Sequence, residues 1–226
     1  MSDVEVRDDL AEAHRLAWEH VASPGSWWTG AQRVELGGTV LLSIADDDPL
    51  PPWVGASTSD RVPAERLAPD AAHDAAYRIA RHAGTMTEDV FRRFADELGE
   101  LPYVELCAVV SAVAAVAHFR RNVGLDIPPF PAPIDGEPTG ERPHELADAE
   151  LNWVPVAAPA DETAAVVQAY TGVPGEMTNT WRMASAQYIP VEEMIHADWS
   201  RRSGGLTRPQ TELIAARVAQ LRECFY

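Results

Sequence analysis

The residues near the end of the sequence that could do chemistry are one cysteine and one glutamate. Cys224 follows the segment ELIAARVAQLRE, and Glu212 is the first residue of that segment, twelve positions earlier. A cysteine thiolate is a nucleophile that peroxides oxidise to a sulfenic acid, and a second thiol then converts this acid into a disulfide. The alternatives are a terminal thiol without a role and a glutamate that only favours the positive end of a helix.

The segment that carries both residues has the pattern of an amphipathic helix. Apolar residues recur with helical spacing along one face, at Leu213, Ala216, Val218 and Leu221. Twelve residues of straight helix span about 18 Å, so Glu212 cannot act on Cys224 directly while the helix is continuous. Within the chain only the first unit could cover this face, so we expect a homo-oligomer that buries it between copies.

The remaining apolar segments also follow helical periodicity, and the fold class expected from them is all-α without a sheet. Thr29 and Thr87 are expected to cap helices, and Gly99 and Gly124 to end them. Helices are predicted at residues 4–21, 30–45, 70–83, 88–98, 103–123, 161–170, 178–188, 191–201 and 208–226.

A proline-rich segment divides the chain. The stretch DIPPFPAPIDGEPTGERP begins at Asp126, and proline both removes a backbone donor and blocks helix formation. Residues 126–160 are therefore expected to form a linker without regular structure, between a first unit at residues 1–125 and a second at residues 161–226.

The two units share a weak internal repeat. Residues 26–46 align with residues 203–224 when Thr29 is placed opposite Thr207, and in both copies a glutamine follows the threonine by three positions. In this register Val34 falls opposite Glu212, and a shift by one residue places Glu35 there instead. In either register the first copy has no cysteine opposite Cys224.

The segment LTRPQTELIAARVAQLRECFY resembles the core of the alkylhydroperoxidase D-like / carboxymuconolactone decarboxylase superfamily, in its peroxidase-related branch. The family pattern has a glutamate, then Cys-x-x-Cys twelve residues later, then a histidine. Glu212 and Cys224 match this pattern, and Phe225 and Tyr226 are typical of the residues between the cysteines. The second cysteine and the histidine would be residues 227 and 231, so the second repeat is expected to stop inside the motif.

The resemblance implies helical repeats and a thiol redox function. In the family a turn at the cysteine lets a second helix fold back, which brings the later cysteine and the histidine beside the glutamate. The implied site residues are Cys224 and Glu212, the substrate is a hydroperoxide, and a dithiol carrier is the reductant. No cofactor and no metal are implied. With one cysteine of the motif, the expected activity is a slow, stoichiometric oxidation of Cys224 without turnover.

Two other functions remain open from the sequence. One is a non-catalytic helical protein of the same fold that oligomerises or binds a small molecule. The other is an enzyme similar to carboxymuconolactone decarboxylase, a branch that does not depend on the cysteines. Cys107 lies in an apolar segment and is expected to be a small core residue, and the seven histidines show no metal-ligand spacing.

Charge and composition restrict the partners and the compartment. The net charge is −17, from 35 acidic and 18 basic residues, and this opposes binding to nucleic acid or to an anionic membrane. The acidic start MSDVEVRDDL lacks the apolar region of a signal peptide, and the apolar run 104–119 is short for a membrane span. Two cysteines form no disulfide framework, so the expected location is the reducing cytoplasm.

Overall fold

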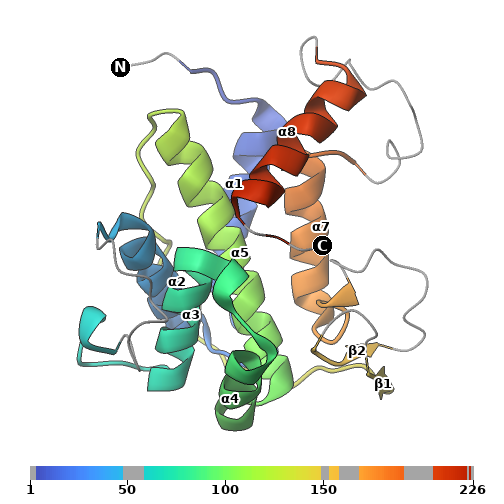
Figure 1. Ribbon diagram of the computed structural model, residues 1–226. Coiled ribbons are helices and arrows are strands. Elements are labelled where there is room, and N and C mark those ends of the chain that lie inside the picture. Colours follow the sequence, from blue (N-terminus) through green and yellow to red (C-terminus); the bar gives the residue numbers. More distant parts are fainter. Residues whose placement is uncertain are drawn as a thin grey trace.

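The computed structural model describes residues 4–47, 59–148, 153–157, 168–190, 206–222 and 224, and its architecture is mostly helical (Figure 1). The all-α class is therefore confirmed. The helices are α1 (Asp8–Ala22), α2 (Gly30–Ala45), α3 (Asp70–His82), α4 (Glu88–Leu98), α5 (Glu100–Asn122), α7 (Pro174–Gln187) and α8 (Arg208–Leu221), with the short 3-10 helices η2 (Ser59–Arg61) and η3 (Ala83–Thr85). The helix predicted at 161–170 lies largely outside the described residues, and the one at 191–201 lies entirely outside them.

The helix ends follow the signals in the sequence. Thr29 caps α2 with a capping box, because its hydroxyl accepts from the Gln32 amide at 3.2 Å and the Gln32 side chain accepts from the Thr29 amide at 3.0 Å. Thr87 caps α4, which ends at Gly99 with φ at 90°. The α5 helix begins three residues earlier than predicted, with Pro102 in its first turn, where a missing amide hydrogen costs nothing.

The core is built around α5. Its buried side chains, among them Leu106, Val109 and Val113, pack in one cluster with apolar residues of α1, α2, α3 and α4. The helix is long and apolar enough to cross a membrane, but 67% of its most apolar 18-residue window is buried inside the fold. That burial is characteristic of a core helix.

The proline-rich segment is extended but lies against the first unit. The ring of Phe130 stacks on Trp18 at 4.9 Å, and the Trp18 indole donates to the Pro128 carbonyl at 3.1 Å. The Ile134 amide donates to the Ala22 carbonyl at 2.8 Å, which joins the segment to the end of α1. No helix forms in the described part of 126–148, as predicted.

The prediction that no sheet forms and that 126–160 lacks regular structure is wrong at two places. Strands β1 (Leu146–Ala147) and β2 (Val156–Ala157) pair antiparallel, with Leu146 opposite Ala157. A strand of two residues is too short to show the alternation of apolar and polar residues that identifies a strand in a sequence.

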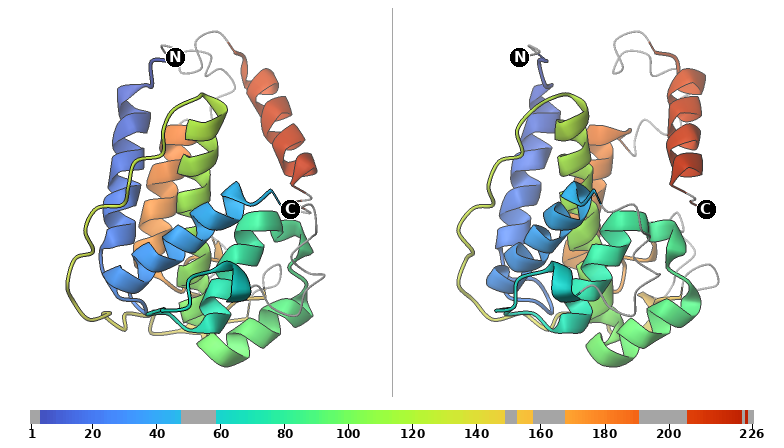
Figure 2. Two further views of the ribbon diagram at one scale, coloured as in Figure 1. Left: turned by 90° about the vertical axis from the view of Figure 1, so that its left-hand side faces the viewer. Right: turned by 60° about the vertical axis from the view of Figure 1, so that its left-hand side comes forward.

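The helices after the proline-rich segment differ in how they pack. α7 lies beside α1 and α5, and it buries Glu176, Asn179, Met183 and Ala186. α8 lies at the side of this bundle, where both turned views show it apart from the other helices (Figure 2). None of the α8 side chains is buried.

Candidate functional site

Glu212 and Cys224, the two site residues predicted from the sequence, lie on and just after α8. The Glu212 carboxylate accepts a hydrogen bond from the Tyr188 hydroxyl at the end of α7, and Arg208 lies 3.5 Å from it in an ion pair. Cys224 is exposed, and its backbone amide donates to the Ala219 carbonyl at 3.0 Å. Each residue thus has its own surroundings, and none of these contacts joins Glu212 to Cys224.

Tyr188 supports Glu212 as a hydrogen-bond donor. Desolvation and then the hydrogen bond to Glu212 raise the pKa of Tyr188 to about 12. The phenol therefore keeps its proton at neutral pH and donates it to the carboxylate.

The second cysteine of the sequence is a poor partner for Cys224. Cys107 lies half-buried within α5, and both cysteines are free. Burial raises the pKa of the Cys107 thiol to about 12, and the hydrogen bond with Tyr103 lowers it less. A thiol that remains protonated at neutral pH is neither a good nucleophile nor a good resolving group.

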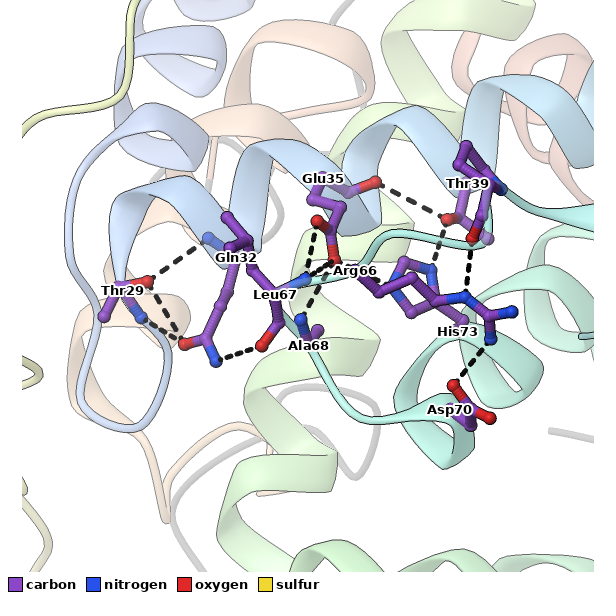
Figure 3. A network of polar contacts seen from close by, with 10 residues as sticks. Thr29, Gln32, Glu35, Thr39, Arg66, Leu67, Ala68, Asp70 and His73 are labelled. Atoms are coloured by element: carbon purple, nitrogen blue, oxygen red, sulfur yellow. Dashed lines mark hydrogen bonds and ion pairs between the residues drawn. The ribbon is translucent and has the colours of Figure 1, made fainter.

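A second group of chemically capable residues joins α2 to α3 (Figure 3). The buried His73 imidazole lies between two side chains of α2: its Nδ1 is 2.7 Å from the Thr39 hydroxyl, and its Nε2 is 2.8 Å from Glu35 Oε1. The result is a continuous chain of hydrogen bonds from a hydroxyl through an imidazole to a carboxylate. Such a chain can accept a proton at the hydroxyl and stabilise the charge that results on the imidazole.

The carboxylate of this group is held in its ionised form. Glu35 accepts from the Leu67 amide at 2.8 and 2.9 Å, from the Ala68 amide at 3.0 Å and from His73. Burial alone would raise the pKa of Glu35, but these hydrogen bonds outweigh it and hold the pKa below its usual value. Gln32, the capping residue of α2, adds a hydrogen bond to the Leu67 carbonyl at 3.1 Å, so the loop that holds Glu35 is itself fixed.

The hydroxyl, imidazole and carboxylate face a cavity of about 370 Å³. Besides these three groups, its walls contain Gly38, Leu42, Pro63, Glu65 and Arg66. Arg66 donates to the Pro63 carbonyl and to Asp70, each at 2.6 Å. The volume lies in the range of small-molecule sites, about 300–1,000 Å³.

The α2–α3 group was missed from the sequence, although parts of its signal are present. When the repeat is aligned on Thr29 and Thr207, Glu35 falls opposite Leu213. A shift of the alignment by one residue places Glu35 opposite Glu212. His73 also shares a buried face of α3 with Ala72 and Ala76, and that face was recognisable as a core position.

A third group is a buried ion-pair cluster that joins four helices. Arg33 Nη1 of α2 lies 2.8 Å from Glu105 Oε1 of α5 and 2.7 Å from Glu176 Oε1 of α7, and His20 of α1 lies 2.9 Å from the same Glu176 oxygen. Arg33 and Glu105 are fully buried. A Cβ atom at Gly25 would lie 1.9 Å from Glu105 Oε1, so only glycine allows the backbone to pass there.

The two carboxylates of this cluster differ in their proton affinity. Desolvation and the nearby Glu176 charge raise the pKa of Glu105, against the opposing charge of Arg33. Desolvation acts in the same direction on Glu176, but its hydrogen bond with His20 and the charge of Arg33 outweigh it and lower its pKa. The pKa values of the two carboxyl groups are thus shifted in opposite directions, although both groups contact the same guanidinium.

No group of three or more histidine, cysteine, aspartate or glutamate side chains that could hold a metal ion occurs among the described residues. Comparison of the chain with protein-family models, with curated proteins and with solved structures gave no match.

Proposed function

We propose that the protein is an alkylhydroperoxidase D-like thiol redox protein in which Cys224 reduces hydroperoxides. The observation that supports this most is the hydrogen bond between Glu35 of α2 and His73 of α3. The family pattern, too, brings a glutamate and a histidine together from consecutive helices. A first repeat without thiols is consistent with the alignment, since neither register places a cysteine opposite Cys224.

The second repeat keeps a thiol that substrate can reach. The exposed Cys224 attacks the terminal oxygen of a hydroperoxide as its thiolate, the O–O bond breaks, and the products are a sulfenic acid and an alcohol. A dithiol carrier is the implied reductant, but Cys107 is a poor resolving thiol for Cys224, so the reaction is expected to stop at the sulfenic acid without turnover. The proposed partners are therefore a hydroperoxide, a dithiol reductant and further copies of the chain, in the cytoplasm.

The experiment is to add cumene hydroperoxide to the reduced chain and to follow thiol loss and the mass of each cysteine peptide. We expect about one equivalent of slow oxidation at Cys224, because Glu212 is about three helical turns away and does not act on the thiol. Cys224→Ser should abolish the reaction. Cys107→Ser is the matched control and should leave it unchanged, because the Cys107 thiol stays protonated.

Glu212→Gln separates the possible outcomes further. Glu212 is about three helical turns from Cys224, so this variant should oxidise at the wild-type rate. Multiple turnovers that fall sharply in Glu212→Gln would contradict the stoichiometric reaction and show that the glutamate takes part. Equal oxidation of Cys107 and Cys224, or no oxidation of Cys224, would instead favour the non-catalytic alternative.

A further inference from the structure

We propose that the cavity between α2 and α3 is a second, cysteine-independent site, in which Thr39, with His73 and Glu35 behind it, removes a proton from a small carbon acid. The proposal does not depend on Cys224. It rests on the chain of hydrogen bonds that ends at the cavity and on the shape and charge of the cavity walls.

The order of the hydrogen bonds gives the relay a direction. Glu35 is ionised and accepts from His73, so Nε2 of the imidazole carries a proton. In the neutral ring Nδ1 is then an acceptor, and Thr39 donates its hydroxyl proton to it across 2.7 Å. The Thr39 oxygen is left with lone pairs that can accept a proton from a molecule in the cavity.

The relay is fixed in place before any ligand arrives. Thr39 and His73 are almost completely buried, and Glu35 is held by the amides of Leu67 and Ala68. A base whose partners are already oriented needs little reorganisation in the transition state, which is the main source of catalytic advantage in such sites. The same contacts stabilise the packing of α2 on α3. That packing alone does not require a cavity beside the Thr39 hydroxyl.

The cavity walls indicate the class of substrate. Leu42 and Pro63 provide apolar surface, and Gly38 leaves open space, since nothing lies within 4 Å of a Cβ atom placed there. Arg66 lies in the same walls, where its guanidinium is paired with Asp70 at 2.6 Å. Glu65 and Glu35 make the site unfavourable for a substrate that is already an anion. The fitting class is a small, neutral, largely apolar molecule with an acidic C–H bond.

The proton transfer balances without any added cofactor. The substrate C–H bond breaks and its proton moves to the Thr39 oxygen, while the Thr39 proton moves to His73 Nδ1. The electron pair stays on the substrate carbon or expels a leaving group from it. The imidazolium that forms is stabilised by Glu35 across 2.8 Å, and it later returns its proton to product or water.

The experiment uses 5-nitrobenzisoxazole as a probe, because removal of its carbon-bound proton opens the ring and releases a coloured phenolate. We expect the full chain to catalyse this reaction with saturation, and Thr39→Val to lower kcat at least tenfold with KM unchanged. Thr39→Ser retains the hydroxyl and should retain most of the rate. His73 acts through Thr39 and is a positioning residue, so His73→Asn should lower kcat and leave KM unchanged as well.

Two further variants make the result independent of folding defects. Gly38→Leu places a side chain into the open space of the cavity, so it should block the reaction while the melting temperature stays the same or rises. Cys224→Ser should have the wild-type rate, which separates this site from the thiol reaction. The proposal is overturned if wild type does not exceed buffer, or if Thr39→Val or Gly38→Leu reacts as fast as wild type.

Discussion

Helices α2 and α8 begin in the same way and lie in different surroundings. Both follow a threonine with a capping box to a glutamine three residues later, Gln32 in one and Gln210 in the other. With the caps aligned, Leu36 and Val40 correspond to Ile214 and Val218. The first two are 0% exposed, whereas the second two are 53% and 55% exposed. The signals that start a helix are local, but what covers its apolar face is decided by distant segments.

The glutamates of the two helices differ in the same way. Glu35 is surrounded by donors from a loop and from α3, which packs closely on α2. Glu212 is held by the Tyr188 hydroxyl and by Arg208 of its own helix. A carboxylate on α2 is thus part of a rigid site with a cavity, whereas the one on α8 lies on a helix with no buried side chain. The following variants test how far this difference extends.

The largest difference in the free energy of unfolding is expected when Arg33 of α2 and the residue aligned with it in α8, Thr211, are each substituted. Arg33→Met leaves the buried carboxylates of Glu105 and Glu176 without their cation, so we expect a loss of about 3–5 kcal/mol in the free energy of unfolding. Thr211→Val should change it by less than about 0.5 kcal/mol. Urea denaturation measures both. A small effect of Arg33→Met would show that the cluster is not part of the cooperative core.

The next largest difference in stability is expected between substitutions on the apolar face of α2 and on that of α8. Leu36→Ala removes a fully buried side chain and leaves a cavity, which costs about 2–5 kcal/mol. Ile214→Ala removes a side chain that is 53% exposed and should cost less than about 1 kcal/mol in dilute solution. If the two variants are equally destabilised, α8 is covered in solution, and the comparison must be revised.

Sequence reasoning succeeded where the information is local. The bounds of α4 and the start of α2 were predicted to the residue, because Thr29, Thr87 and Gly99 each fix a helix end through their own backbone contacts. α7 begins four residues before its predicted start at 178, with Pro174 in its first turn. The residues around Pro174 lack the apolar spacing of a helix, so this proline was not recognised as the start of one.

The site residues outside α8 could not be predicted in the same way. Arg33, Glu105 and Glu176 come from three helices, and only their packing shows that they share one buried contact. His73 and Glu35 are 38 positions apart, so their hydrogen bond depends on how α3 packs against α2. The internal repeat points to Glu35 alone, and no sequence pattern pairs it with His73 or groups Arg33 with Glu105 and Glu176.

The exposed face of α8 is expected to associate with another copy of the chain. Leu213, Ile214, Val218 and Leu221 are each more than half exposed, and such a group on one helix favours burial against a partner. Ile214→Asp/Val218→Asp should weaken self-association at least about tenfold, or about 1.4 kcal/mol. Ile134→Asp, a change at an equally exposed position outside α8, is the control. Sedimentation that shows a strict monomer of wild type at high concentration would rule the interface out.

The contribution of Glu35 to stability should depend on pH. The pKa of Glu35 is lowered in the folded chain, so its contribution to stability is fully present above the ordinary value of 4.5 and is lost as the pH falls through the folded value. At neutral pH Glu35→Gln should cost about 1–2 kcal/mol, because an amide cannot accept all the donors around it. This difference from wild type should shrink below pH 4.5. A difference that stays constant with pH would exclude the charge as its cause.

The smallest effects are expected at the two caps, where the sequences agree best. Thr29→Ala removes a cap from a helix in the cooperative core, so it should lower the free energy of unfolding by about 1 kcal/mol. Thr207→Ala removes the same cap from α8, which buries no side chain, so α8 can fray while the rest stays folded. Global unfolding should then be unchanged, while amide hydrogen exchange in the first turn of α8 becomes faster. Equal losses of global stability in the two variants would mean that α8 unfolds together with the core. The contacts that hold α8 would then be stronger than its lack of buried side chains indicates.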